Sequence, residues 1–129
     1  MLRLAVATLA FALLAACSSA PTSTGVQRNF PKAALRGAVV VGEAPAILLN
    51  GKAARLAPGA RIRDANNMMV VPGALFGGRF LVHYTVDTSG LVKDVWILRP
   101  DEAANRWPTT AEESEKWLFV PSSQVWLKP

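Results

Sequence analysis

The chain has 129 residues, of which 51% are apolar, and it carries a formal net charge of +5. This length gives room for one domain, and a domain of about a hundred residues buries a workable core without metals or disulfides. The chain has a single cysteine, which excludes an internal disulfide.

The first sixteen residues have the pattern of an export signal. Arg3 supplies a positive charge, and residues 4–16 form an apolar run in which only Thr8 is polar. Thirteen helical residues span roughly 20 Å, which is shorter than the hydrocarbon core of a bilayer, about 30 Å thick. The pattern therefore predicts a signal peptide over residues 1–16 and not a transmembrane helix.

The apolar run ends in Leu14-Ala15-Ala16-Cys17, which resembles the lipobox of bacterial lipoprotein precursors. The resemblance implies cleavage between Ala16 and Cys17, a diacylglycerol on the Cys17 thiol and a third acyl chain on the new amino group. Several acyl chains hold a protein firmly to a lipid leaflet. In enteric-type bacteria the non-acidic Ser18 implies sorting to the outer membrane, with the protein facing the periplasm. An ordinary secretory signal that ends in cysteine is the alternative.

Residues 17–34 are predicted to be a lipidated cysteine followed by a flexible linker. Residues 18–31 are rich in Ser, Thr, Pro and Gly and offer little to bury. Fourteen such residues have an r.m.s. span of about 20 Å. The sequence therefore predicts that the folded domain occupies residues 35–129 and floats near the membrane.

Residues 35–78 carry the signals of short strands separated by turns. Asn50-Gly51 between two strand-like runs predicts a tight hairpin. Pro58-Gly59 is predicted to turn the chain, residues 64–67 have turn chemistry, and Phe76 is placed near the tip of a loop. Strands are predicted at residues 38–41, 46–49, 52–56, 60–63 and 68–71.

The clearest unit is a hairpin over residues 79–98. Residues 87–90, Asp-Thr-Ser-Gly, fit a type I turn with glycine in the left-handed position. A regular register around this turn pairs Val86 with Val92 and Tyr84 with Asp94. One face of the hairpin is then apolar with a single acidic exception, and the other face is half apolar. This pattern is typical of a sheet that is covered on both sides or curls into a barrel.

The last thirty residues predict short helices and two closing strands. Residues 100–104 suit one helical turn, and the capping box at residues 110–113 predicts a helix over residues 111–117. Residues 117–120 and 124–127 are predicted strands. The whole pattern predicts an all-β domain, a small barrel or sandwich of short antiparallel strands with minor helix.

Two resemblances extend beyond the signal. Residues 49–64 and 95–98, with Tyr84 and Gly90 between them, look like small uncharacterised exported proteins of proteobacteria, and this resemblance brings no activity with it.

More weakly, residues 86–95 and 117–121 are similar to the C-terminal domain of TonB-type energy transducers. That similarity implies an edge strand that pairs with a receptor peptide. Those domains carry helices where this chain has its Asn50-Gly51 hairpin and the following strands, which is a departure from the pattern.

The domain offers no recognisable catalytic or metal-binding set. His83 is the only histidine, so a metal site would need carboxylates or thiolates around it, and Cys17 is assigned to lipid. No serine has a nucleophile-elbow context. The carboxylates at 101–102 and 112–115 suit helix starts, where the helix dipole favours acids. We therefore expect no enzyme activity, metal or cofactor; an enzyme that uses His83 as its base is the alternative.

Basic residues gather in the first half of the domain. Residues 28–79 contain eight Lys or Arg and two acids, whereas residues 80–129 contain five and seven. A basic half can attract anionic lipid headgroups or cell-wall polymers, and it can also be an ordinary solvated surface. Arg61 and Arg63 on a predicted strand, and Trp107 in a loop, are the candidate partner-binding residues.

The sequence thus predicts a membrane-anchored envelope lipoprotein without catalytic activity. Cys17 would connect it to the membrane, and an envelope protein or a cell-wall or other anionic polymer would be its partner. Export makes nucleic acid an unsuitable partner. A TonB-like adaptor that uses residues 117–127 as an edge strand is the alternative hypothesis.

Overall fold

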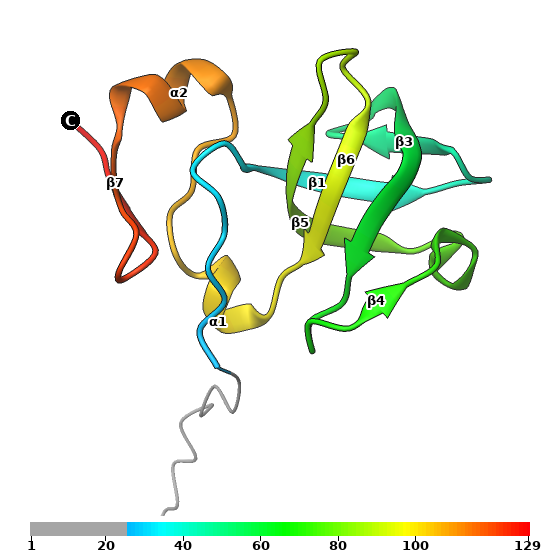
Figure 1. Cartoon of the computed structure of the whole chain (residues 1–129), viewed down its shortest axis with the longest axis horizontal. Coiled ribbons are helices and arrows are strands. Elements are labelled where there is room, and N and C mark those ends of the chain that lie inside the picture. The colour runs from blue at the N-terminus through cyan, green and yellow to red at the C-terminus, as the bar shows by residue number, and fades with distance from the viewer. Residues whose placement is uncertain (1–25) are drawn as a thin grey trace, which may run out of the picture.

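The computed structural model describes residues 26–129 (Figure 1). The predicted signal peptide, the lipidation site Cys17 and residues 18–25 of the predicted linker lie outside the described residues. No helix within residues 26–129 is long and apolar enough to cross a bilayer.

Short strands dominate the described part of the chain. In order, the elements are β1 (Leu35–Val41), β2 (Ala46–Leu49), β3 (Lys52–Arg63), β4 (Met69–Val70), the 3₁₀ helix η1 (Pro72–Leu75), β5 (Arg79–Val86), β6 (Val92–Ile97), α1 (Pro100–Ala103), α2 (Ala111–Lys116), β7 (Leu118–Val120) and β8 (Val125–Leu127). The predicted all-β class with minor helix is confirmed.

Five of these strands close into a barrel. β1 pairs with β2, β2 with β3, β3 with β6, β6 with β5, and β5 returns to β1. The order β5-β1-β2-β3 is a Greek key, and five-stranded Greek-key barrels form the architecture to which the OB-fold also belongs. The junction between β3 and β6 is parallel. The sequence predicts antiparallel strands, and this is wrong at this one junction. β6 is joined to β5 by a hairpin and has no direct connection to β3, so it can run parallel to β3.

The hairpin between β2 and β3 has the predicted turn. Asn50 and Gly51 have φ values of 53° and 80°, as a type I′ turn requires. The Asn50 side chain also accepts a hydrogen bond from the backbone N–H of Ala38 at 2.9 Å, which ties the turn to β1.

β3 is one bent strand where the sequence predicted two strands separated by a turn at Pro58-Gly59. Residues 52–55 pair with β2, pairing with β6 begins at Leu56, and the last two residues also pair with β4. The register against β6 shifts between Leu56 and Arg61. Gly59 has a φ of +74°. The Pro-Gly pair therefore bends the strand around a corner of the barrel without reversing the chain.

The β5–β6 hairpin keeps the predicted turn but changes the predicted register. Val86 pairs with Val92 as expected, but Tyr84 then pairs with Val95 and not with Asp94. Lys93 is the extra residue of a β-bulge, which moves every later side chain of β6 to the opposite face. Asp94 consequently points away from the barrel interior, and the exception in the predicted apolar face disappears.

The barrel interior is an apolar core supplied by all five strands. Its buried members are Val39, Val41, Ile47, Leu56, Ile62, Val82, Tyr84, Val92 and Val95. Val82 and Tyr84 come from β5 and alternate with His83, which faces outward.

A second, aromatic cluster lies outside the barrel, between β5–β6 and the C-terminal segment. Phe30, Ala34, Trp107 and Trp126 are buried there. β7 and β8 form their own two-stranded sheet, and Figure 1 shows this orange and red segment beside the barrel. The predicted helix start is also confirmed, because the Thr110 side chain accepts a hydrogen bond from Glu113 N at 3.2 Å.

The aromatic cluster includes residues of the predicted linker, so the predicted start of the folded domain at residue 35 is wrong. Residues 28–34 belong to the predicted flexible linker, but Arg28, Phe30 and Ala34 are buried against the domain. The backbone N–H of Phe30 donates to the Gln124 side chain at 2.8 Å. The segment has the composition of a linker, and three specific side chains nevertheless fix it in place.

Candidate functional site

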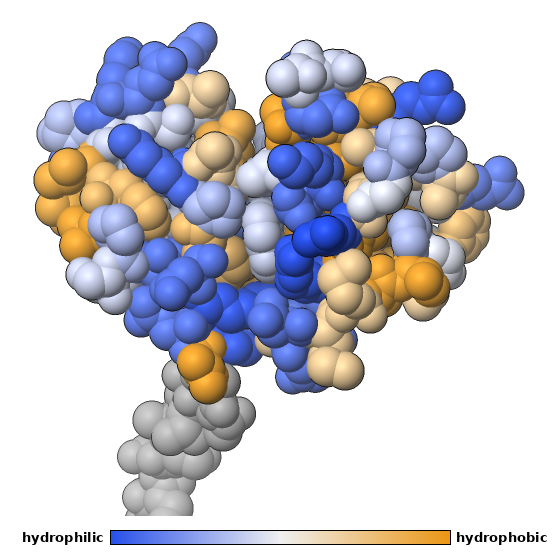
Figure 2. Space-filling model, in the orientation of Figure 1, coloured by the Kyte–Doolittle hydropathy of each residue, from blue (hydrophilic) through white to orange (hydrophobic). Residues whose placement is uncertain are grey.

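Two adjoining hollows lie where the barrel meets the N-terminal segment and α1. We call the larger one the basic groove: its volume is about 640 Å³, and its lining includes Arg28, Arg63, Asn66, Asn67, Trp96 and Arg99. The smaller one, the inner pocket, has a volume of about 170 Å³ and shares Gln27, Arg28 and Arg99 with the groove. Figure 2 shows strongly hydrophilic side chains gathered between the C-terminal segment and the barrel. The groove has the volume of a small-molecule site.

Arg63 is the side chain that β3 presents to the basic groove. Ile62 faces the barrel interior, so alternation along the strand turns Arg63 outward. Its guanidinium carbon lies 5.5 Å from the ring centroid of Trp96, its Cα partner on β6. Nη1 forms an ion pair with Asp94 Oδ1 at 3.6 Å. This nitrogen is buried and has no hydrogen-bond partner among the described residues. The aromatic face of Trp96 and the carboxylate of Asp94 thus hold the guanidinium in place beside the groove.

Arg61 lies on the same outer face of β3, opposite Asp94 on β6, and is exposed. It does not line the groove. The structure therefore places the two predicted partner-binding arginines on one face and brings only Arg63 into the groove.

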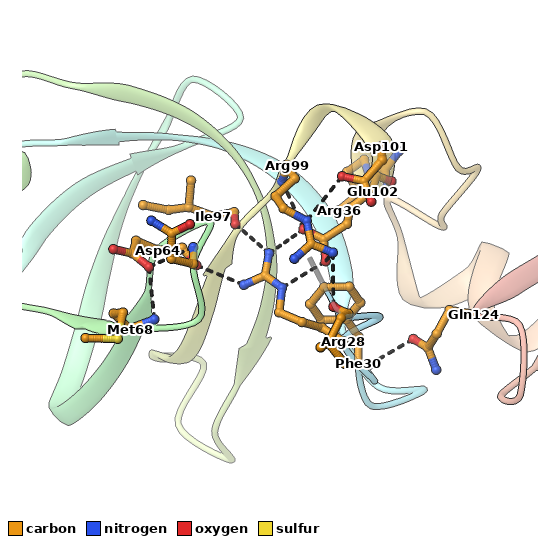
Figure 3. A network of polar contacts seen from close by, with 12 residues as sticks. Arg28, Phe30, Arg36, Asp64, Met68, Ile97, Arg99, Asp101, Glu102 and Gln124 are labelled. Carbon is orange, nitrogen blue, oxygen red and sulfur yellow. Dashed lines mark hydrogen bonds and ion pairs between the residues drawn. The ribbon is translucent and has the colours of Figure 1, made fainter. Parts of the chain in front are cut away.

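Arg28 lines both hollows and lies at the centre of a network of polar contacts (Figure 3). Its Nε donates to Glu102 Oε2 at 2.8 Å, and its Nη2 pairs with the other carboxylate oxygen of Glu102. Nη1 donates to the carbonyl of Asp64 at 2.9 Å, and Nη2 to the carbonyl of Ile97 at 2.8 Å. This buried pair therefore ties the N-terminal segment to α1, to the end of β6 and to the turn after β3. Nothing in the sequence around Arg28 signalled this role.

Arg36 on β1 supports α1 from the other side. Its guanidinium donates to three carbonyls at the end of that helix, those of Glu102, Ala103 and Asn105, at 3.0, 3.1 and 2.6 Å. Burial lowers the pKa of Arg36 below its ordinary value, because desolvation disfavours the charged form.

His83 lines the inner pocket, and only 1% of its surface is exposed. Its ring centroid is 4.5 Å from that of Phe30 and 4.2 Å from that of Trp107. Burial, assisted by the positive charges of Arg36 and Arg28, lowers the pKa of His83 to about 3. The imidazole is therefore neutral at physiological pH, and its Nδ1 has no hydrogen-bond partner within residues 26–129.

Trp107, predicted from its loop context to be a partner-binding residue, is buried and not exposed at the surface. Only 4% of its surface is accessible, and its indole N–H donates to the carbonyl of Ala34 at 2.7 Å. The loop folds back over the outer face of β5, where the ring packs on His83 and Trp126. A long-range packing of this kind leaves no local pattern in the sequence.

The residues around the two hollows carry an excess of positive charge. Three arginines, Arg28, Arg63 and Arg99, line the basic groove, and no acid of the described chain does; Asp101 and Glu102 line the inner pocket. Within residues 26–129, no group of three His, Cys, Asp or Glu side chains is placed to hold a metal ion. The arrangement suits recognition of an anionic group.

We compared the chain with protein-family models, with curated proteins and with solved structures. None of the three comparisons found a match. The function is therefore inferred from the residues and the geometry of the two hollows.

Proposed function

We propose that this protein is a lipid-anchored, non-catalytic binding protein of the bacterial cell envelope. Its anchor is the lipidated Cys17, in a leaflet of the outer membrane that faces the periplasm. Its basic groove binds an acidic group, a carboxylate or a phosphate, on a cell-wall polymer or an envelope protein.

The observation that carries the binding proposal is the state of Arg63. Its guanidinium lines a groove of about 640 Å³, where it lies over Trp96 and forms an ion pair with Asp94 at 3.6 Å. A planar guanidinium matches the geometry of a carboxylate or phosphate. The side chains of Asn66 and Asn67 line the same groove and add further hydrogen-bonding groups.

The inner pocket supports a binding role over an enzymatic one. A general base works best when its pKa is near the operating pH, and the pKa of His83 is lowered to about 3. The imidazole is wedged between Phe30 and Trp107, where it contributes to packing.

The groove can be tested with purified peptidoglycan and the mature chain that carries Cys17→Ser, which removes the lipid. We expect Arg63→Gln to weaken binding about tenfold, because a charge-assisted hydrogen bond contributes roughly 1.5–3 kcal/mol. Lys52→Gln, on the exposed far end of the same strand, removes the same charge outside the groove and is the matched control. We also expect high salt to weaken the wild-type interaction.

Equal losses from Arg63→Gln and Lys52→Gln would show that only the total charge matters and would contradict a groove. Full binding by Arg63→Gln would contradict it as well. Cosedimentation, read as the fraction of protein that pellets with the polymer, gives both results.

A second candidate function is β-augmentation by the C-terminal hairpin. Among the described residues, β7 and β8 pair only with each other, so each strand has an edge open to another chain. Leu118 and Leu127 on this hairpin are exposed. Crosslinks from these two positions to one strand of a partner protein in intact cells would favour this candidate.

A further inference from the structure

The connection between β3 and β5 exposes a group of large apolar side chains. Met68, Met69, Val71 and Phe76 are between 62% and 70% exposed, and we call this segment, residues 68–76, the apolar loop. In Figure 2, apolar side chains lie on the lower right of the visible face, over β4. Contiguous exposed apolar surface on a small protein marks a contact with another apolar phase or molecule.

The apolar loop is held firmly in this exposed position. β4 pairs with the end of β3, so Met69 is fixed opposite Arg63. The backbone N–H of Gly77 donates to the carbonyl of Val41 at 2.8 Å, and the carbonyl of Gly78 accepts from Val41 N at 3.0 Å. Leu75 packs on the barrel core. The loop therefore presents its apolar side chains while its own backbone is anchored to the barrel.

The charge around the apolar loop is mainly basic. One acid, Asp64, adjoins the loop, and its carboxylate accepts a hydrogen bond from the backbone N–H of Met68 at 2.9 Å. Residues 65–86 contain no aspartate or glutamate, and the cations Arg61 and Arg79 flank the loop on β3 and β5. Such a surface attracts anionic phospholipid headgroups, and its apolar centre suits the boundary between headgroups and acyl chains.

The apolar loop lies beside the point where the chain leaves towards its predicted anchor. Arg28 donates to the carbonyl of Asp64, and the turn at residues 65–67 lines the same groove as residues 26–29. In Figure 1 the start of the described chain and β4 both lie on the lower side of the view. Val26 follows Cys17 by nine positions, so the chain between them reaches at most about 30 Å. A lipid on Cys17 would thus keep the loop within reach of the bilayer.

We infer that the apolar loop docks into the headgroup region of the phospholipid leaflet that holds the anchor. Phe76, Val71 and the two methionines enter the boundary of the acyl chains, and Arg61 and Arg79 face anionic headgroups. The inference rests on the proposed lipid anchor. Docking of this loop turns the basic groove towards a fixed direction relative to the membrane and prevents free rotation of the domain on its tether.

The test uses the mature, lipidated chain in vesicles that contain phosphatidylglycerol. Lipidation consumes the only native cysteine, so Phe76→Cys provides a unique thiol for a polarity-sensitive fluorophore. Leu118→Cys is the matched control, because Leu118 is 64% exposed on β7 and Phe76 is 65% exposed. We expect nitroxide groups on the acyl chains to quench the label at position 76 at least twofold and to leave the label at position 118 unchanged.

Two results would overturn the inference. If the lipidated protein floats with the vesicles and both labels remain unquenched, the anchor stands and the docking surface fails. If the protein carries no lipid, the Cys17→Ser chain is titrated with the same vesicles. Phe76→Ser is then expected to weaken binding about tenfold and Leu118→Ser less than twofold. Equal affinities for the two variants would overturn the docking surface independently of the anchor.

Discussion

At the residue scale, His83 shows how packing decides protonation. The side chain is buried between Phe30 and Trp107, and its pKa is lowered to about 3 from an ordinary value of 6.5. The folded state therefore keeps a neutral imidazole at a pH where the unfolded chain has already bound a proton. The contribution of His83 to the free energy of unfolding is fully present above pH 6.5 and is lost as the pH falls from 6.5 towards 3.

The resulting pH dependence can be measured by chemical denaturation. Between pH 7.5 and pH 5 we expect the free energy of unfolding to fall by about 2 kcal/mol because of this one group. His83→Leu removes the only histidine, so this variant should lose less stability over the same interval. Parallel profiles for the two proteins would contradict the depressed pKa.

The Arg28–Glu102 pair is the second residue-scale determinant. Removal of one partner leaves the other charge buried, and such changes cost about 3 kcal/mol or more. We expect Arg28→Met to destabilise the domain by about that amount, and the double variant Arg28→Met, Glu102→Met to be more stable than the single one. Denaturant melts measure both values.

Asp101 provides the control for this pair. Its carboxylate is 40% exposed and lies 3.2 Å from Arg99 Nε, and the hydrogen bond from Arg99 lowers the pKa of Asp101. Asp101→Asn should cost less than about 1 kcal/mol, because exposed ion pairs contribute little. A loss as large as that of Arg28→Met would mean that burial does not distinguish the two pairs.

At the element scale, local signals were predictable and irregularities were not. The Asn50-Gly51 turn, the turn at residues 87–90 and the start of α2 depend on residues adjacent in the chain, and all three are confirmed. The bulge at Lys93 and the bend at Gly59 depend on how a strand meets its neighbours in a closed barrel. In a regular register, Asp94 would lie on the apolar face of the hairpin. This misplaced charge was the one signal in the sequence that indicated a bulge.

The bulge at Lys93 predicts how two single-residue deletions affect stability. Without Lys93, Val92 and Val95 still face the interior and Asp94 still faces outward, so we expect a loss below about 2 kcal/mol. Thr85 on β5 lies next to the bulge, on the strand that has no extra residue. Deletion of Thr85 therefore leaves Tyr84 and Val82 out of register with β6. Thermal unfolding should show a folded Lys93 deletion and an unfolded Thr85 deletion, and the reverse order would contradict the assigned register.

At the scale of the whole molecule, the two ends of the described chain pack together against the barrel. Phe30 comes from the N-terminal segment, and Trp107 and Trp126 come from the C-terminal half, so the aromatic cluster exists only when all three meet. Of the candidate site residues, Arg63 was predictable from strand alternation. Arg28, Glu102 and the burial of Trp107 were not, because their partners lie more than sixty residues away in the chain.

The proposed lipid anchor would determine where all these features act. The most direct test is the mass of the mature protein, extracted from bacterial envelopes with detergent. We expect a chain that begins at Cys17 and carries a diacylglycerol and an amide-linked acyl chain. A chain that still begins at Met1, or a Cys17 without lipid, would contradict it.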